Sequence, residues 1–392
     1  MALHNSNKIY PYHFLFLYAF TYACNAVYNT FVPVYLKNTG FSQSLIGTLL
    51  AMGPFVAVIA QPLWGMASDR AKTKNQVLKL LIAGSAVAII LFPLSTNFYY
   101  IFALIAIFTF FQTSINPISD TITLECLENT RWKFGPIRLA GTLGFALTSI
   151  ITGTVANLNI NNIFILYFAV AAVAFLTTLK LPSVKGHQSG GTRVALWEMF
   201  KNRELVLLLC FNMVIFTTLG YYYSFFPIYY RQMGADNMLL GISAFVSAIS
   251  ELPFLLLANK ILEKFGIKFT LICSAAVMGI RWLLLFLASG IYVIPFINAL
   301  HGFSFIVFSY CFITYINKEV PKELRASGQT MNVLVGMGIA RIIGSIAGGV
   351  LSDAIGVKRI FLYNSILNFL AIAIFGSIFL IVSVRKGEET DA

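Results

Sequence analysis

Charged side chains are scarce in this sequence. Only 11% of the 392 residues are Asp, Glu, Lys or Arg, whereas 58% are hydrophobic, and the mean hydropathy is +0.80. An ordinary soluble chain carries roughly twice that charged fraction. A water-soluble globular fold is therefore excluded, and the sequence predicts a protein whose main solvent is lipid.

Acidic residues are rarer than basic ones, with 15 Asp and Glu against 27 Lys and Arg, which gives a formal net charge of +12. Twenty of the basic residues fall in tails and loops on one predicted side of the membrane, four fall on the other side, and three lie inside apolar runs. This bias follows the positive-inside rule. We therefore expect both termini in the cytoplasm, a location in the cytoplasmic (inner) membrane, and no nucleic-acid partner.

Cysteine and histidine are also few, with five and four residues. The cysteine spacings match no metal or redox motif. The sequence contains no evident Ser/His or Cys/His nucleophile pair and no phosphate-binding glycine loop. A membrane-embedded enzyme is therefore disfavoured, and we expect no catalytic residue, no metal and no cofactor.

Long apolar runs are abundant, and runs of about 20 residues are typical of membrane-spanning helices. Strands of a β-barrel would instead show about ten alternating residues each. The sequence predicts an all-α membrane protein with twelve transmembrane helices, at 11–36, 42–67, 77–95, 98–127, 134–156, 162–180, 204–230, 238–260, 268–289, 292–317, 327–351 and 359–384.

One long polar stretch, "KLPSVKGHQSGGTRVALWEMFKNRE", interrupts the apolar runs after the sixth. Its proline and three glycines predict a flexible linker, and "VALWEMF" within it predicts a short amphipathic helix on the membrane surface. The predicted domains are an N-terminal six-helix bundle (1–180), a cytoplasmic linker (181–203) and a C-terminal six-helix bundle (204–392). "GMASDRAKTK" and "NKILEKFGIK" follow the second helix of each half, so we expect two pseudo-symmetric bundles.

The stretch "QPLWGMASDRAKTK" resembles the signature between helices 2 and 3 of the major facilitator superfamily. The resemblance implies that Gly65 allows close helix packing. It also implies that Asp69, beside Arg70, bonds backbone amides and a partner arginine, as a conformational latch on the inner side. The usual glycine after Asp-Arg is missing, because Ala71 and Lys72 follow here.

Charged residues inside the apolar runs are the second signal. They are Asp120, Arg138, Glu251, Arg281 and Arg341, and His301 accompanies them. A charge in mid-bilayer costs about 3 kcal/mol on insertion scales, so such residues should pair or face a wet cavity. Two acids against three arginines leave a cationic excess, which suits an anionic or polar substrate. The alternative is that these residues only join helices to one another.

The stretch "SDTITLECLENTRWKFGPIRLAGTLGFAL" resembles the hairpin of helices 4 and 5 in the lactose permease family. That resemblance implies a substrate site containing Asp120 and Arg138, with Phe145 as the aromatic that packs on the sugar. "MGIRW" and "NALHGFSF" also match, and they imply a proton-coupling role for Arg281 and His301.

Several positions depart from that family. Its protonated glutamate is Ser304 here, its lysine is Asn298, and its sugar-binding glutamate early in helix 8 is Ile242. An acid appears instead at Glu251, in "SAISELPF". These features resemble the neighbouring branch of phenylpropionate permeases, and the nucleoside–proton symporters are also similar. Glu251 is therefore expected to join the proton-coupling set.

Amide and aromatic groups extend the predicted substrate cavity. Gln112, Asn116 and Asp120 form a stripe at i, i+4, i+8, and polar residues on one face of a membrane helix must look inward. A second face, in the first helix, is formed by Asn25, Tyr28 and Asn29, and Asn212, Tyr221 and Tyr222 are candidates in the seventh.

The sequence thus predicts a proton-coupled symporter that imports a small polar organic solute, such as a sugar, by alternating access. Its expected partners are the solute, a proton and membrane lipid, and we expect a monomer. The alternatives are import of an aromatic acid or nucleoside, and a proton/drug efflux antiporter. Antiporters of the superfamily usually carry a Gly-Pro element deep in helix 5, whereas Gly135-Pro136 lies at the start of that helix.

Overall fold

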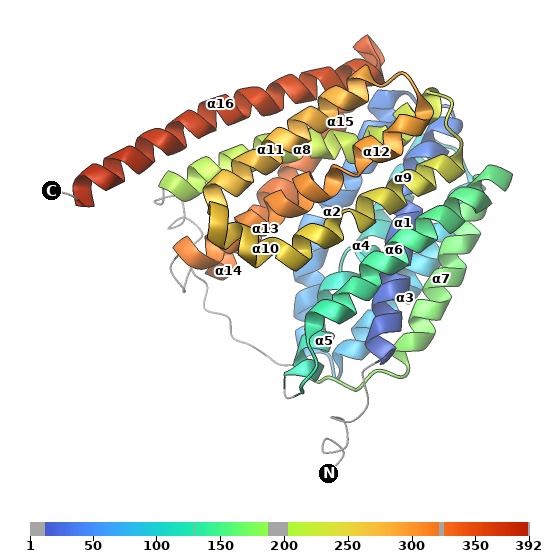
Figure 1. The fold of residues 1–392 in the computed structure, drawn as a ribbon. Coiled ribbons are helices and arrows are strands. Elements are labelled where there is room, and N and C mark those ends of the chain that lie inside the picture. Colours follow the sequence, from blue (N-terminus) through green and yellow to red (C-terminus); the bar gives the residue numbers. More distant parts are fainter. Residues whose placement is uncertain (1–11, 129, 187–202, 321–324, 391–392) are drawn as a thin grey trace. The chain divides into compact units, whose positions relative to one another are not determined.

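The computed structural model describes residues 12–128, 130–186, 203–320 and 325–390 (Figure 1). Every regular element in this part of the chain is a helix. The predicted amphipathic segment "VALWEMF" and most of the predicted linker lie outside the described residues.

In the described part of the chain, seven α-helices precede the linker: α1 (Tyr12–Asn38), α2 (Gln43–Arg70), α3 (Lys74–Ile90), α4 (Phe98–Gln112), α5 (Ile115–Leu127), α6 (Phe134–Leu158) and α7 (Asn162–Thr178). Nine follow it: α8 (Arg203–Gln232), α9 (Asn237–Ile249), α10 (Glu251–Phe265), α11 (Ile267–Leu287), α12 (Ile294–Asn298), α13 (His301–Glu319), α14 (Arg325–Val333), α15 (Arg341–Ile355) and α16 (Val357–Thr390).

Within the described ranges, ten helical segments are long and apolar enough to cross a membrane, and ten of the twelve predicted runs coincide with them. The other two runs correspond to α1 and to the 17-residue α7. α1 is long enough to cross a membrane, but its asparagines and tyrosines lower its mean hydropathy, so it is not among the ten.

Four of the predicted helices are interrupted. The fourth divides into α4 and α5, and the eighth divides into α9 and α10 at Ser250. The tenth divides into α12 and α13, and a π-helical stretch (Leu334–Ala340) separates α14 from α15. The residues that begin α10, α13 and α15 are Glu251, His301 and Arg341. Breaks and π-helical turns in membrane helices are frequent at functional sites.

The chain divides into two compact units. The first unit comprises Met1–Phe41, Thr48–Gly191 and Tyr230–Ala248, and the second comprises Ser42–Gly47, Thr192–Tyr229 and Ile249–Ala392. In the first unit α9 packs tightly on α6, because a Cβ added to Gly241 would lie 2.2 Å from the carbonyl oxygen of Ser149. The predicted domain boundaries at 180 and 204 stay a prediction.

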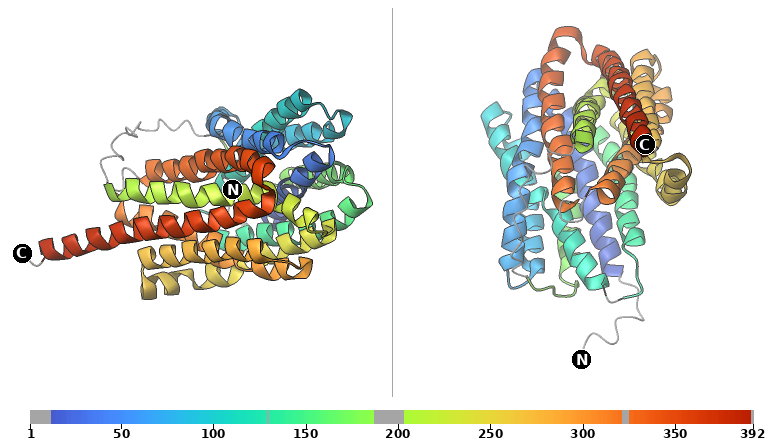
Figure 2. Two further views of the ribbon diagram at one scale, coloured as in Figure 1. Left: turned by 90° about the horizontal axis from the view of Figure 1, so that it is seen from above. Right: turned by 90° about the vertical axis from the view of Figure 1, so that its left-hand side faces the viewer.

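Two helices of the second unit, α11 and α16, lie side by side. At 1.5 Å per residue, the 34 residues of α16 span about 51 Å and the 21 of α11 about 32 Å, so α16 continues past its neighbour (Figure 2). Trp282 of α11 is fully buried, with its ring centre 5.1 Å from that of Tyr222 on α8. This packing fixes the neighbouring Arg281 inside the unit.

Candidate functional site

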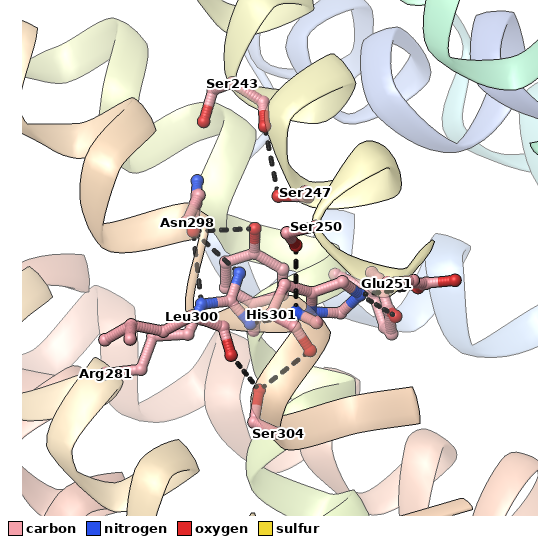
Figure 3. A network of polar contacts seen from close by, with 12 residues as sticks. Ser243, Ser247, Ser250, Glu251, Arg281, Asn298, Leu300, His301 and Ser304 are labelled. Carbon is pink, nitrogen blue, oxygen red and sulfur yellow. Dashed lines mark hydrogen bonds and ion pairs between the residues drawn. The ribbon is translucent and has the colours of Figure 1, made fainter. Parts of the chain in front are cut away.

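The backbones of α10 and α13 touch at the two helix breaks. The hydroxyl oxygen of Ser250 accepts a hydrogen bond from the backbone N–H of Gly302, at 2.9 Å. A Cβ added to Gly302 would lie 1.7 Å from the carbonyl oxygen of Ser250, so only glycine fits there. This contact brings Glu251 and His301 face to face, with Oε1 and Nε2 3.5 Å apart (Figure 3).

Arg281 fixes the proton on His301. The Arg281 guanidinium is fully buried, and its Nη1 lies 2.8 Å from Nδ1 of His301. A guanidinium can only donate, so Nδ1 must be the acceptor. The imidazole is therefore neutral in this arrangement, with its proton on Nε2 and directed toward Glu251.

Asn298 holds the other side of the same guanidinium. Its Oδ1 accepts hydrogen bonds from Nη2 and Nε of Arg281, at 2.6 and 3.2 Å (Figure 3). The same oxygen accepts from the hydroxyl of Tyr222, at 3.2 Å. The ring centres of Tyr222 and Trp282 lie 4.2 and 5.1 Å from the guanidinium carbon. The partners that surround Arg281 are thus neutral groups and aromatic faces, which stabilise a cation without cancelling its charge.

The more exposed edge of this cluster is formed by Glu251, Tyr223 and Arg341, all three half-buried. The hydroxyl of Tyr223 lies 3.5 Å from Nε2 of His301, and the guanidinium of Arg341 lies 5.0 Å from the centre of the Tyr223 ring. A Cβ added to Gly220 of α8 would lie 2.8 Å from the Cα of Arg341, so α8 and α15 approach each other closely at this point.

Ser304 replaces the glutamate that the lactose permease family carries near its histidine. The Ser304 hydroxyl donates hydrogen bonds to the carbonyl oxygens of Leu300 and His301, at 3.0 and 3.2 Å (Figure 3). It is thus tied to its own helix, and Glu251 is the carboxylate that faces the histidine.

In the first unit, two tyrosines of α1 hold Asp120 and Arg138. Asp120 accepts a short hydrogen bond from the hydroxyl of Tyr18, and the Arg138 guanidinium lies 4.2 Å from the ring centre of Tyr22. Among the described residues the two form no direct ion pair. The sequence suggested Asp120 as the partner of Arg138; the structure places the tyrosines as their contacts.

The structure brings together two of the three residues of the predicted polar stripe, although α4 ends between them. Gln112 donates a short hydrogen bond to Asn25, and both line a small cavity of about 10 Å³ together with Asn116. This volume is about the minimum that holds one water molecule. Asp120, four residues after Asn116 on the same helix, is not among the residues that line it, and its carboxylate accepts from Tyr18 instead.

The other predicted substrate residues have different surroundings. The ring of Tyr28 stacks on that of Phe108, with centres 4.3 Å apart, and Asn29 is exposed. Phe145 is half-buried on α6, where its carbonyl oxygen accepts a hydrogen bond from the hydroxyl of Ser149.

The predicted latch has a lysine at its centre. Lys74 is buried, forms a short ion pair with Glu125, and lies 3.8 Å from Asp69. Arg70 is exposed, and a Cβ added to Gly65 would meet no atom within 4 Å. Among the described residues, the cation beside Asp69 is therefore a lysine rather than the expected arginine, and Gly65 has no close neighbour there.

Sequence reasoning missed Tyr18, Tyr22 and Tyr223, and it noted Asn298 only as a departure from the family pattern. Tyr18 and Tyr22 lie one turn apart on α1, and their rings stack with centres 6.2 Å apart. Asn298 stands three residues before His301, a spacing that places two polar groups on one face. These two spacings could have indicated the contact residues from the sequence.

Three comparisons place the chain among known transporters. A family model described as "MFS_1 like family" matches residues 12–363. An uncharacterised transporter of Bacillus subtilis, YwbF, is 27% identical over 356 residues, covering 90% of this chain and 88% of that protein. The maltose permease of Geobacillus stearothermophilus is 23% identical over 366 residues, covering 92% of each.

A solved structure agrees in fold. The nucleoside transporter NupG, in a mutant form, superposes with a TM-score of 0.87 at 20% identity, covering 94% of this chain and 99% of that one. This likeness confirms the predicted all-α major facilitator fold. The chain belongs to the MFS_1-like family of the major facilitator superfamily and is a multi-pass membrane transporter.

Proposed function

We propose that this transporter is a proton-coupled symporter that imports a small organic solute, with Glu251 as the proton-carrying residue. The observation that carries the proposal is the contact of a half-buried carboxylate with a histidine whose neutral form is fixed by a buried arginine. A membrane-embedded carboxylate beside a hydrogen-bond donor is suited to a protonation change.

Each residue of the contact network around Glu251 has its own proposed role. Ionised Glu251 accepts from the Nε2–H of His301, and protonated Glu251 becomes a neutral acid. His301 stays neutral in both states, because its Nδ1 must continue to accept from Arg281. Asn298 is the positioning residue for Arg281. A proton taken up from outside would therefore reside on Glu251.

The first unit supplies the proposed polar contacts for the solute, through Asp120, Arg138, Asn116, Gln112 and Asn25. Charged and amide side chains of this kind can bond hydroxyl and carbonyl groups of a solute. The maltose permease and NupG carry names of polar organic solutes, which is consistent with this assignment. The loop charge bias supports a cytoplasmic-membrane location with both termini inside.

The test uses the purified protein in proteoliposomes that contain a pH-sensitive dye. A panel of sugars, nucleosides and aromatic acids is added outside, and the lumenal pH is followed. Substrate should acidify the lumen, since coupled transport carries protons inward. Glu251→Gln should abolish this signal while retaining substrate binding.

The matched control is Glu263→Gln, an exposed glutamate on the same helix, which should leave proton movement unchanged. Substrate uptake without proton movement in the wild type, or uphill accumulation by Glu251→Gln, would contradict the proposal.

A further inference from the structure

We propose that the transported solute is an organic monoanion, a monocarboxylate, and that Arg341 contacts its carboxylate. This inference rests on the proposed proton coupling and adds the substrate class. Arg341 was noted in the sequence only as one of the intramembrane charges.

The charged residues of the cluster lie within the membrane-spanning part of the chain. Glu251, Arg281 and Arg341 lie well inside candidate membrane spans Asn237–Phe265, Ile267–Leu287 and Gly328–Ile355. His301 contributes no charge, because its Nδ1 accepts from Arg281. The three charges therefore sum to +1 when Glu251 is ionised and to +2 when it is protonated.

Of the two arginines, Arg341 is the more accessible. Arg281 is fully buried behind Asn298, His301 and aromatic rings, so a solute does not reach it. Arg341 is half-buried, and its guanidinium lies beside the ring of Tyr223. A planar guanidinium is the side chain best shaped to bind a carboxylate through two parallel hydrogen bonds.

Close contacts between α8 and α15 hold the backbone around Arg341. A Cβ added to Gly344, one turn further along α15, would lie 2.2 Å from the carbonyl oxygen of Thr217 on α8. The hydroxyls of Ser224 and Ser345 lie 2.7 Å apart between the same two helices. The π-helical stretch ends at Ala340, directly before the arginine. These contacts fix the backbone from which the Arg341 side chain extends.

Binding of the anion and of the proton are coupled through Glu251. The groups facing Glu251 are His301 from α13 and Tyr223 from α8, with Arg281 of α11 behind the histidine and Arg341 of α15 beside the tyrosine ring. Protonation of Glu251 removes the negative charge of this set. A monoanion then binds more tightly, and by reciprocity its binding raises the proton affinity of Glu251. A neutral solute gains nothing from this electrostatic coupling.

The test compares acids with their neutral amides on the wild-type protein. The pairs are glucuronate with glucuronamide and 4-hydroxyphenylpropionate with its amide, and maltose and uridine serve as further neutral probes. Thermal-shift titrations at pH 5.5 and 7.5 give the affinities. We expect at least one acid to bind about tenfold or more tightly than its amide, with a 5- to 150-fold gain at the lower pH.

Variants locate the site. Arg341→Gln should weaken binding of that acid by about tenfold to a hundredfold, and Arg341→Lys should recover part of the loss. Glu251→Gln, which mimics the protonated acid, should bind it tightly at both pH values. Arg359→Gln, an exposed arginine of α16, is the matched control and should bind as the wild type does.

An electrical measurement keeps the proposal testable even if Arg341→Gln does not fold. One proton moving with one monoanion carries no net charge, so uptake of the acid should follow a pH gradient and ignore a potassium diffusion potential. Potential-driven, proton-coupled uptake of a neutral solute would overturn the monoanion proposal and leave proton symport standing. The monoanion proposal would also be overturned if none of the acids bound more tightly than its amide. Acid uptake without proton movement would instead overturn the proposed symport.

Discussion

Glu251 and His301 are each the first residue of a helix, and Oε1 of the glutamate lies 3.5 Å from Nε2 of the histidine. Both helices begin at a break, and the two breaks are joined by the Ser250–Gly302 contact. The geometry of the proposed proton site therefore depends on backbone packing as much as on the two side chains, and this can be tested.

Gly302→Ala should damage both stability and coupling. The new Cβ would lie 1.7 Å from a carbonyl oxygen, so α10 and α13 must separate. Overpacking of this kind costs about 1–3 kcal/mol of unfolding free energy. We expect a melting temperature lower by several degrees in detergent and weaker solute-dependent proton uptake in vesicles.

The control for this change is Gly376→Ala on α16, where an added Cβ meets no atom within 4 Å. That variant should be neutral or slightly stabilising, because alanine restricts the unfolded chain more than glycine does. Equal melting temperatures for Gly302→Ala and the control would contradict the packing argument.

His301→Gln should retain proton coupling, whereas His301→Leu should lose it. A glutamine can accept from Arg281 through its oxygen and donate to Glu251 through its nitrogen, as the neutral imidazole does. Leucine can do neither. Proton uptake in vesicles distinguishes the two variants, and loss of coupling in both would mean that the histidine itself must carry the proton.

The helices were predictable because length and hydropathy are local properties of a sequence, and all twelve predicted runs coincide with helical segments. The breaks are signalled only in part. Pro253 and Pro117 each follow a break, and a proline cannot bond the carbonyl group four residues before it, which belongs here to Ile249 and Thr113. No local pattern shows that the break at Ser250 lies against Gly302, 52 residues away in the chain.

The candidate site was likewise predictable only in part. Glu251, Arg281 and His301 stood out because charged and titratable residues are rare in apolar runs. Asn298 was recognised only as a departure from a family pattern. Its role comes from Arg281, 17 residues before it, and Tyr222, 76 residues before it, and only the tertiary structure brings these together.

Asn298→Ala should destabilise the protein strongly. The substitution removes the acceptor of three hydrogen bonds, two of them from the buried Arg281 guanidinium. Each hydrogen bond to a charged group contributes about 1.5–3 kcal/mol. We expect a large fall in melting temperature, and a small one for Asn317→Ala, whose side chain is exposed. Asn298→Gln, which keeps an amide oxygen, should recover part of the loss, and no difference between the Asn298→Ala and Asn317→Ala variants would refute the assigned role.

Lys74→Met should loosen the inner end of the first unit. The lysine side chain is only 4% exposed, and its removal leaves the carboxylates of Glu125 and Asp69 without their shared cation. Its backbone N–H also donates to the carbonyl oxygen of Val184, at 2.8 Å, so α3 is joined here to the segment after α7. Because Glu125 and Asp69 are partly hydrated, we expect a loss of about 1–2 kcal/mol rather than the larger cost of a fully buried charge. Thermal unfolding in detergent measures this loss.

The control is Lys72→Met, two residues earlier and exposed, which should change the melting temperature little. An equal loss in both variants would show that general charge, rather than the Lys74 contacts, stabilises this region.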